Sequence, residues 1–274
     1  MRLRPLKWSA FIVALVLSYV IAASVSLTVP RRVVQQFYAT LHAWSSGPLA
    51  TTACADNTGG NGISATCSID SGGADLLIFT YSSFVTSSVT PMDSKSNTWT
   101  CKTLMITNAY AKRMCYAWSG GGGFSVGMSH TMTASLNSSF MGATFSAWSG
   151  SKTSGDPFDQ EATDTNGVGS PTSGVVTITP TGGANDLFVT SGVGHGTTEF
   201  DAATVDSPFT LASRQVYVGG SSLGDQVWYA TGTGSTTATW HFSATFYNID
   251  MLAFLPGAAA APKPCRLLLL GVGC

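Results

Sequence analysis

Residues 72–77 read Gly-Gly-Ala-Asp-Leu-Leu, and residues 182–187 read Gly-Gly-Ala-Asn-Asp-Leu. Each stretch joins turn-forming glycines to the start of an apolar run, which is typical of a strand that follows a tight turn. From Gly59 to Gly257, short β-branched and aromatic runs alternate with Gly, Ser, Asn and Asp, without a sustained period of 3.6 residues. This pattern predicts an all-β protein with an antiparallel β-sandwich.

Landmarks of this segment recur at nearly constant offsets, which indicates an internal duplication. We therefore expect two internally repeated halves, residues 61–150 and 173–257, that share the core of one jelly-roll-like sandwich. The paired landmarks are Asp75 with Asp186 at an offset of 111 residues, Trp99 with Phe209 at 110, Tyr116 with Tyr229 at 113, and Gly150 with Gly257 at 107.

The sandwich segment and the stretch just before it contain four cysteines, which indicate disulfides in an exported chain. No Cys-x-x-Cys pair occurs, so neither a zinc ribbon nor a redox motif is indicated. We expect the local pairs Cys54 with Cys67 and Cys101 with Cys115.

The duplication favours the pair Cys101 and Cys115 in particular. These positions are equivalent to Leu211 and Trp228 in the second half, which are both large and apolar. A pair that is bridged in one half and packed in the other is typical of positions that face the core from neighbouring strands.

Four short motifs mark turns and core positions of the segment: Gly-Gly-Ala-Asp-Leu-Leu at 72–77, Ser-Asn-Thr-Trp-Thr at 96–100, Cys-Tyr-Ala at 115–117 and Phe-Ser-Ala-Trp-Ser-Gly at 145–150. Together they resemble a broad, largely uncharacterised family of bacterial extracellular β-sandwich domains of jelly-roll or immunoglobulin-like type. That family typically has Gly-Asn-Thr-Tyr-Thr, Tyr-Tyr-Ala and Glu-Tyr-Ser-Gly at the last three places. Here Ser96 replaces the first glycine, and Ala147 and Trp148 replace Glu-Tyr. The resemblance covers about residues 61–257 and implies a fold and an exported setting, but no catalytic residue.

The N-terminus has the pattern of an export signal. Three basic residues precede an uncharged apolar stretch from Trp8 to Val29 that contains small residues suited to cleavage. A stretch of about 20 residues is also long enough to span a bilayer. Residues 1–29 are therefore interpreted as a signal peptide or a membrane anchor, and this segment is the only expected contact with the membrane. The rest of the chain is expected outside the cell or on its surface.

Residues 30–58 are expected to form a short helix and a linker. Val33, Phe37, Leu41 and Trp44 recur every three to four residues, which is the period of an amphipathic helix. The sandwich domain is then expected to occupy residues 59–257.

Residues 258–274 are expected to form a linker and an apolar tail. The tail resembles a shortened Pro-Glu-Pro C-terminal sorting signal of exported bacterial proteins, with Lys263 in place of the glutamate and without a terminal arginine cluster. A frayed tail is the alternative. Cys265 and Cys274 are either paired with each other or free.

Charge and composition exclude two classes of protein. The chain has 13 basic and 14 acidic residues and a formal net charge of -1, so it lacks the electrostatic footprint of a nucleic-acid-binding protein. With 44% apolar residues it also differs from disordered chains, which combine low hydrophobicity with high net charge.

The loop after one expected strand gathers His195, Glu199 and Asp201. Nitrogen and carboxylate ligands suit a divalent metal, but the spacing matches no zincin or EF-hand pattern. We interpret the segment as a solvated polar loop, with a binding site as the alternative.

A dense acidic run contains Asp156, Asp159, Glu161 and Asp164, followed by Asn166. Closely spaced oxygen ligands suit calcium, but the glycine and the bidentate glutamate of an EF-hand are missing. We interpret the run as an exposed connector between the two halves. The sequence therefore predicts no cofactor, with calcium here as the alternative.

The sequence also offers little support for catalysis. Residues 123–127 match the bare pattern Gly-x-Ser-x-Gly, but no helix is predicted behind them, so the match is interpreted as chance. We expect neither a catalytic triad nor a closed metal site, and His130 and His241 are interpreted as surface or packing residues.

Aromatic residues give the remaining functional hypothesis, because such rings can stack on sugars. Most lie at expected core positions, so at most one or two are expected to be exposed. The predicted function is a non-catalytic, exported module for adhesion or carbohydrate binding, with an extracellular glycan or like subunits as partner. A self-associating structural surface protein is the alternative, and a metal-dependent hydrolase is the third hypothesis. The aromatic residues considered are Trp99, Trp118, Trp148, Trp228, Trp240, Tyr116, Tyr229 and Tyr247.

Overall fold

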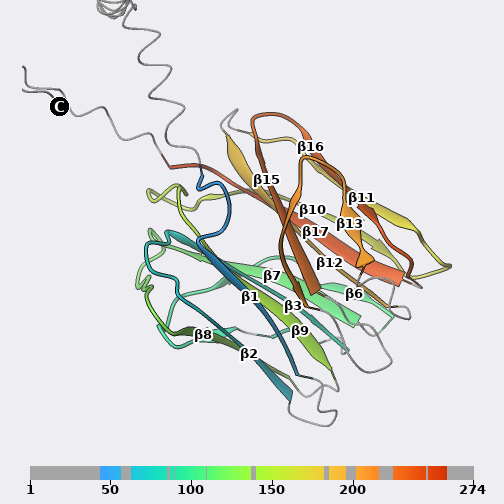
Figure 1. The fold of residues 1–274 in the computed structure, drawn as a ribbon, viewed down its shortest axis with the longest axis horizontal. Coiled ribbons are helices and arrows are strands. Elements are labelled where there is room, and N and C mark those ends of the chain that lie inside the picture. The colour runs from blue at the N-terminus through green and yellow to red at the C-terminus, as the bar shows by residue number, and fades with distance from the viewer. Residues whose placement is uncertain are drawn as a thin grey trace, which may run out of the picture. The chain divides into compact units, whose positions relative to one another are not determined.

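The computed structural model describes residues 44–56, 63–84, 87–89, 91–108, 110–136, 140–181, 185–195, 202–215, 225–244 and 246–257. The regular elements in these ranges are antiparallel β-strands in two halves (Figure 1), so the all-β prediction is confirmed. The predicted export segment, all but the last residue of the predicted helix, and the C-terminal tail with its two cysteines lie outside these ranges. Within them, no helix has the length and apolar character that a membrane crossing requires.

The first half consists of a larger and a smaller sheet. The larger sheet has the strand order β1-β9-β3-β7-β5, with β6 also paired to β7, and the smaller sheet has the order β2-β8-β4. The strands are β1 (Ala50–Asp56), β2 (Ile63–Ile69), β3 (Leu76–Ser83), β4 (Met92–Asp93), β5 (Thr100–Cys101), β6 (Met105–Thr107), β7 (Tyr110–Trp118), β8 (His130–Leu136) and β9 (Met141–Trp148).

The second half repeats this arrangement. Its larger sheet has the order β10-β17-β12-β15-β14, and its smaller sheet has the order β11-β16-β13. The strands are β10 (Phe158–Asn166), β11 (Ser173–Ile178), β12 (Asp186–His195), β13 (Thr204–Val205), β14 (Thr210–Gln215), β15 (Asp225–Gly232), β16 (Thr236–His241) and β17 (Phe246–Phe254). Taken in chain order, β1 corresponds to β10 and β9 to β17, and the intervening strands correspond in the same way, except that β6 has no counterpart among the described strands of the second half. The duplication predicted from the sequence is therefore present in the topology.

The strand register corrects one landmark of the duplication. Leu76 pairs with Trp148 in the first half, and Leu187 pairs with Phe254 in the second. Trp148 and Phe254 are therefore equivalent, at an offset of 106 residues. The sequence match that placed Gly150 opposite Gly257 is out of register by one residue.

Each half begins one strand earlier than the sequence indicated. The segment expected to be a linker contains β1, and the acidic run expected to be a connector forms β10. Both strands lie at the edge of a larger sheet. Their side chains are mostly half-buried, and an edge strand tolerates polar and charged residues, so neither shows the apolar alternation that reveals a strand.

The two halves share a core, as predicted, but each half also has a core of its own. In the first half an apolar cluster that includes Phe79, Met132 and Phe145 lies between its two sheets. In the second half a separate cluster, including Phe188 and Trp240, does the same. A third cluster lies between the two larger sheets. The sheets are therefore stacked in four layers, with the larger sheets inside and the smaller sheets outside.

The two larger sheets are buried on both faces, which explains their sequences. Every residue of β3, β9 and β17 is buried. A strand covered on both faces has no reason to alternate between apolar and polar residues. Continuous runs such as Leu76–Ser83 follow from this arrangement rather than from a single sandwich.

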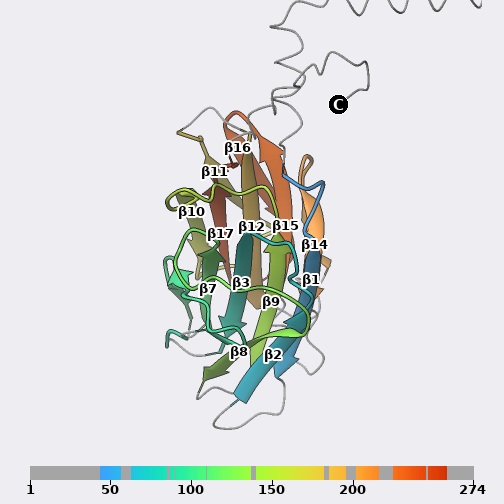
Figure 2. The same cartoon turned by 90° about the vertical axis from the view of Figure 1, so that its left-hand side faces the viewer.

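The larger sheets face each other with reversed strand order, as in a symmetric dimer. β1 contacts β14 at one side of this interface (Figure 2), and β10 contacts β6 at the other. The aromatic contacts repeat in the same way. Tyr116 packs edge-on against Phe254 with ring centroids 5.2 Å apart, and the equivalent pair, Tyr229 and Trp148, has the same separation of 5.2 Å. The two halves are therefore related by an approximate two-fold axis, as identical subunits are in an isologous interface.

Two disulfides join the pairs expected from the sequence. Cys54 and Cys67 link β1 to β2, with Cα atoms 5.3 Å apart. Cys101 and Cys115 lie directly opposite each other on β5 and β7, with Cα atoms 4.0 Å apart.

The second half places Leu211 opposite Trp228, as the duplication predicted. The expectation that both positions of this pair face the core is wrong, because Leu211 is 38% exposed. Leu211 lies on the edge strand β14, as Cys101 lies on the edge strand β5.

Candidate functional site

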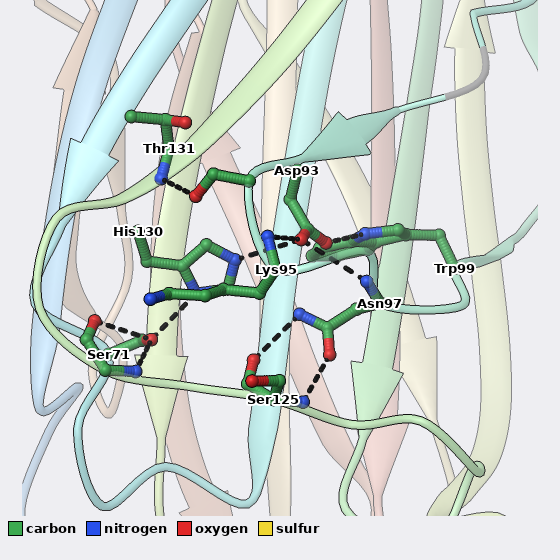
Figure 3. A network of polar contacts seen from close by, with 10 residues as sticks. Ser71, Asp93, Lys95, Asn97, Trp99, Ser125, His130 and Thr131 are labelled. Carbon is green, nitrogen blue, oxygen red and sulfur yellow. Dashed lines mark hydrogen bonds and ion pairs between the residues drawn. The ribbon is translucent and has the colours of Figure 1, made fainter.

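The first half contains a buried Ser–His–Asp contact chain (Figure 3). Ser71 Oγ lies 2.7 Å from His130 Nδ1, and His130 Nε2 lies 3.3 Å from Asp93 Oδ1. The side chains of His130 and Asp93 are fully buried, and so is Ser71. Sequence analysis did not predict this contact chain. His130 also packs edge-on against Phe145, as expected for a packing histidine.

Asp93 is held by the turn that follows β4. Its Oδ1 accepts the backbone N–H of Lys95 at 2.7 Å and of Asn97 at 3.3 Å, and its Oδ2 accepts the indole N–H of Trp99 at 2.6 Å. Ser96 takes a φ of 60° in this turn, a conformation that glycine adopts more readily.

These hydrogen bonds fix the charge of Asp93. Burial alone would raise the pKa of this carboxyl group. Hydrogen bonds from His130, from Trp99 and from the backbone of Lys95 and Asn97 outweigh burial and lower the pKa to about 2. Asp93 is therefore a carboxylate over the physiological pH range.

Ser71 is held from the other side by the loop before β8. The N–H of Gly127 donates to Ser71 Oγ at 3.0 Å, and the N–H of Ser71 donates to the carbonyl of Gly127 at 3.1 Å. Asn97 and Ser125 exchange a second reciprocal pair of side-chain to backbone hydrogen bonds. Ser125, the serine of the Gly-x-Ser-x-Gly pattern, therefore holds the loop before β8 against Asn97. The serine that contacts His130 is Ser71.

We name Ser71, His130 and Asp93 the polar clasp, because they join the end of β2, the start of β8 and β4. A serine nucleophile must reach a substrate and needs donors aimed at an oxyanion. Ser71 Oγ is instead enclosed and bonded to Gly127. Its partner on the imidazole is Nδ1, the nitrogen that faces the carboxylate in the usual triad arrangement. This geometry indicates that the polar clasp holds the loops around β2, β4 and β8 in place.

The outer faces of both smaller sheets carry cross-strand ladders of hydroxyl groups. In the first half Thr66 and Thr133 hydroxyls lie 3.2 Å apart, and Ser135 donates to Ser64 at 3.1 Å. In the second half Thr177 and Thr237 hydroxyls lie 2.9 Å apart, and Thr179 donates to Ser235 at 3.2 Å. These contacts are exposed. Threonine suits such positions because it combines a β-branched carbon with a hydroxyl.

A second buried polar cluster lies between the two larger sheets. Lys112 Nζ lies 2.9 Å from Asp250 Oδ1, and both side chains are fully buried. Lys112 Nζ also donates to Ser191 Oγ at 2.7 Å, and Ser191 Oγ donates to Asp225 Oδ1 at 3.0 Å. Thr80 donates to the other oxygen of Asp225. We name Lys112, Asp225, Asp250 and Ser191 the interface cluster.

Burial raises the pKa of both acidic groups of the interface cluster. The nearby Lys112 opposes this effect at Asp225, and so do the hydroxyls of Thr80 and Ser191, but the pKa stays above its usual value. At Asp250 burial again outweighs Lys112 and raises the pKa to about 6. One lysine therefore shares a buried space with two carboxyl groups that hold their protons more tightly than usual.

The His195 hypothesis is only partly covered by the structure. His195 is the last residue of β12, where its backbone pairs with Phe246. The side chain of His195 and the residues Glu199 and Asp201 lie outside the described part of the chain. Their proposed binding site stays a prediction.

The acidic run does not gather around one point. Its side chains accept hydrogen bonds from separate places: Asp156 from Tyr116, Asp159 from Thr181, Glu161 from Thr103, and Asp164 from Val175 and Tyr247. No cluster of three or more His, Cys, Asp or Glu side chains suited to a metal occurs among the described residues. We therefore interpret these acidic side chains as contacts that connect the edge strand β10 to the neighbouring segments.

The aromatic platform is not formed by the residues considered. Trp148, Trp240 and Tyr116 are fully buried, and Trp228 and Tyr247 are buried as well. Trp99, Trp118 and Tyr229 are half-buried and pack against the clusters described above. None of these eight residues is exposed, in agreement with the expectation of at most one or two, because the faces on which the rings lie are covered by the other half or the other sheet.

Sequence analysis missed the polar clasp and the interface cluster. The clasp brings together three residues from separate strands and loops. Their spacing in the sequence follows no motif, so the sequence did not predict their contact. The interface cluster did leave a signal: Lys112, Asp225 and Asp250 lie within otherwise apolar strands, where a charged residue needs a partner. That signal identifies buried charges but not which of them meet.

Comparison with protein-family models found no match, and comparisons with curated proteins and with solved structures found none either. The function is therefore inferred from the residues and the geometry of this chain.

Proposed function

We propose that the protein is exported and serves as a non-catalytic module for carbohydrate binding or adhesion at the cell surface or in an extracellular matrix. Two disulfides within one β-sandwich half support an oxidising compartment, where such bonds persist. Each half has the strand arrangement that we interpret as jelly-roll-like, an architecture found in lectin domains.

The observation that carries the proposal is the pair of hydroxyl ladders. They lie on the outer faces of the two smaller sheets, which are the outermost layers of the stack, and their exposed residues are largely uncharged Ser and Thr. A polysaccharide offers matching hydroxyl donors and acceptors. One protein chain with two such faces would also bridge two polysaccharide chains of a matrix. Such bivalent binding increases avidity.

The test compares binding to insoluble polysaccharides and to glycan arrays for the full chain and for ladder variants. Thr66→Lys with Thr133→Lys is expected to weaken binding by at least about tenfold, which corresponds to about 1.4 kcal/mol. Thr165→Lys on the exposed side of β10 is the matched control. Equal binding by all three proteins, or no binding by any, would contradict the proposal.

The alternative, self-association as a structural surface component, is favoured by exposed apolar residues on short edge strands. Met92 on β4 is 63% exposed, and Val175 on β11 is 49% exposed. Unpaired strand edges with such side chains invite pairing with a second copy. Assembly that depends on concentration, without glycan binding, would favour this alternative.

Catalysis is tested separately at the polar clasp. We infer that Ser71 and His130 stabilise loops and that Ser71→Ala leaves the binding properties unchanged. A general esterase or glycosidase activity that Ser71→Ala abolishes, in a variant that remains folded, would contradict the non-catalytic proposal. A metal bound near His195 would revive the hydrolase hypothesis.

A further inference from the structure

We propose that Lys112 and Asp250 form an intramolecular isopeptide bond that covalently joins the two halves of the protein. The two residues lie on β7 and β17, in different halves, and Lys112 Nζ is 2.9 Å from Asp250 Oδ1. Because Cγ of Asp250 is bonded to this oxygen, the amine lies beside the carbon that it would attack. This proposal is independent of the glycan-binding function.

The surroundings favour condensation over a simple ion pair. Both side chains are fully buried, and in the described part of the chain Lys112 is the one polar partner of the carboxyl group of Asp250. Removing an ammonium and a carboxylate from water is costly. Transfer of a proton from Lys112 to Asp250, by way of Ser191 and Asp225, gives the neutral amine and the neutral acid that react. Fixed proximity raises the rate of such a reaction by many orders of magnitude, and the exclusion of water opposes the reverse hydrolysis.

A path for the proton is also present. Lys112 Nζ donates to Ser191 Oγ at 2.7 Å, and Ser191 Oγ donates to Asp225 Oδ1 at 3.0 Å. Burial raises the pKa of Asp225, which makes this carboxylate a better proton acceptor than an exposed one. Asp225 contacts the reacting amine only through Ser191, so it acts as a positioning residue and as a temporary store for the proton.

The reaction balances without any further reagent. The ammonium of Lys112 gives one proton to Asp225 through Ser191, and the freed amine attacks Cγ of Asp250. The new bond is Nζ–Cγ, and the bond that breaks joins Cγ to one carboxylate oxygen. That oxygen leaves as water with two protons from the original ammonium, including the one returned by Asp225. The products are one amide and one water molecule, with no change of oxidation state.

The test is peptide mapping of the purified full chain after reduction and alkylation, which removes the disulfides as a source of cross-links. Trypsin does not cleave after a lysine whose ε-amine is acylated. We expect a branched peptide that joins the Lys112 and Asp250 segments, with a mass equal to the sum of both minus one water. Recovery of the two segments only as separate linear peptides, with cleavage after Lys112, would overturn the proposal.

Variants locate the bond and the role of Asp225. Lys112→Arg keeps the positive charge but cannot form the amide, so the branched peptide should disappear. Asp225→Asn should lower the yield of branched peptide at least about tenfold, whereas Asp225→Glu should retain it. A purely structural role of Asp225 predicts equal yields in both variants that fold. If the wild-type branched peptide is present and both variants match the wild type, the bond stands and the proton path is wrong.

Discussion

Lys112 and Asp225 occupy the same position in the two halves, and their charges are opposite. In the first half Thr80 pairs with Met114, and in the second half the equivalent Ser191 pairs with Val227. Met114 and Val227 are therefore equivalent. Lys112 lies two residues before Met114, and Asp225 lies two residues before Val227.

A true symmetric dimer would place identical residues at both positions, so a buried lysine would face the same environment as its copy. The duplicated chain can instead place a cation in one half and anions in the other. Buried charges of opposite sign favour the intramolecular pairing of unlike halves and disfavour the pairing of two like ones.

Removal of the buried cation gives the largest expected effect on this comparison. Lys112→Ala removes the group that joins Asp225 and Asp250 to the first half, as an ion pair or as the proposed amide, which should lower the free energy of unfolding by about 3–5 kcal/mol. Chemical denaturation measures this change, and Lys152→Ala, in a surface loop, is the control. A loss below about 1 kcal/mol would show that the cluster does not hold the halves together.

The second comparison concerns Asp75 and its equivalent, Asp186. Asp75 accepts the backbone N–H groups of Gly150 and Ser151 at 2.8 and 3.0 Å. In the second half the position of Gly150 is taken by Pro256, which has no N–H to donate. Neither oxygen of the buried Asp186 accepts a hydrogen bond among the described residues. Burial, with the nearby Asp159, raises its pKa to about 7.

This difference predicts a pH dependence of opposite sign to that of a stabilised carboxylate. The folded state holds the Asp186 proton up to about pH 7, whereas the unfolded state releases it near pH 4. Stability should therefore fall as the pH rises from about 4 to about 7, by as much as about 4 kcal/mol.

Asp186→Asn should remove the Asp186 part of this slope, above about pH 6 in particular, in denaturation measured at several pH values, whereas the part due to Asp225 and Asp250 remains. Pro256→Gly, which restores the missing donor, should reduce the Asp186 part. An unchanged slope in Asp186→Asn would show that another group is responsible.

The disulfide Cys101–Cys115 is the third difference, since the second half packs Leu211 against Trp228 at this place. Replacing both cysteines by alanine should cost about 3 kcal/mol, as expected for a loop of this length. Cys101→Leu with Cys115→Trp transfers the second half's pair and should recover part of this loss. Thermal unfolding under oxidising conditions measures both, and a transferred pair no more stable than the alanine variant would mean that the two sites are not equivalent.

The polar clasp gives the smallest effect. The pKa of Asp93 is lowered to about 2, so its contribution is complete above about pH 4 and is lost as the pH falls to about 2. The expected loss is about 2 kcal/mol. Asp93→Asn should abolish this acid-induced component. The second half's His241–Asp206 pair is about half exposed, so Asp206→Asn should change stability by less than about 0.5 kcal/mol. Equal effects of the two substitutions would contradict the assigned difference in burial.

Local patterns were sufficient for much of the fold. The Gly-Gly-Ala turns and the spacing of Cys101 and Cys115 predicted strands, a duplication and both disulfides. They failed at β1 and β10, because an edge strand with half-buried side chains lacks the alternation of a strand with one buried face. They predicted that most of the aromatic residues are buried but not what buries them, since the sequence does not say which faces of a sheet a second sheet will cover.

The sequence by itself determined the all-β class, the repeat and the cysteine pairs, because turn residues, strand periodicity and short loop closure are local properties of the chain. Only the tertiary structure decided that the halves form two sandwiches joined through their larger sheets. The same packing brought Lys112 to Asp250 and Ser71 to His130. Such contacts depend on how strands that are distant in sequence stack on one another. The sequence around a side chain that is buried between two sheets does not identify the residue that it contacts.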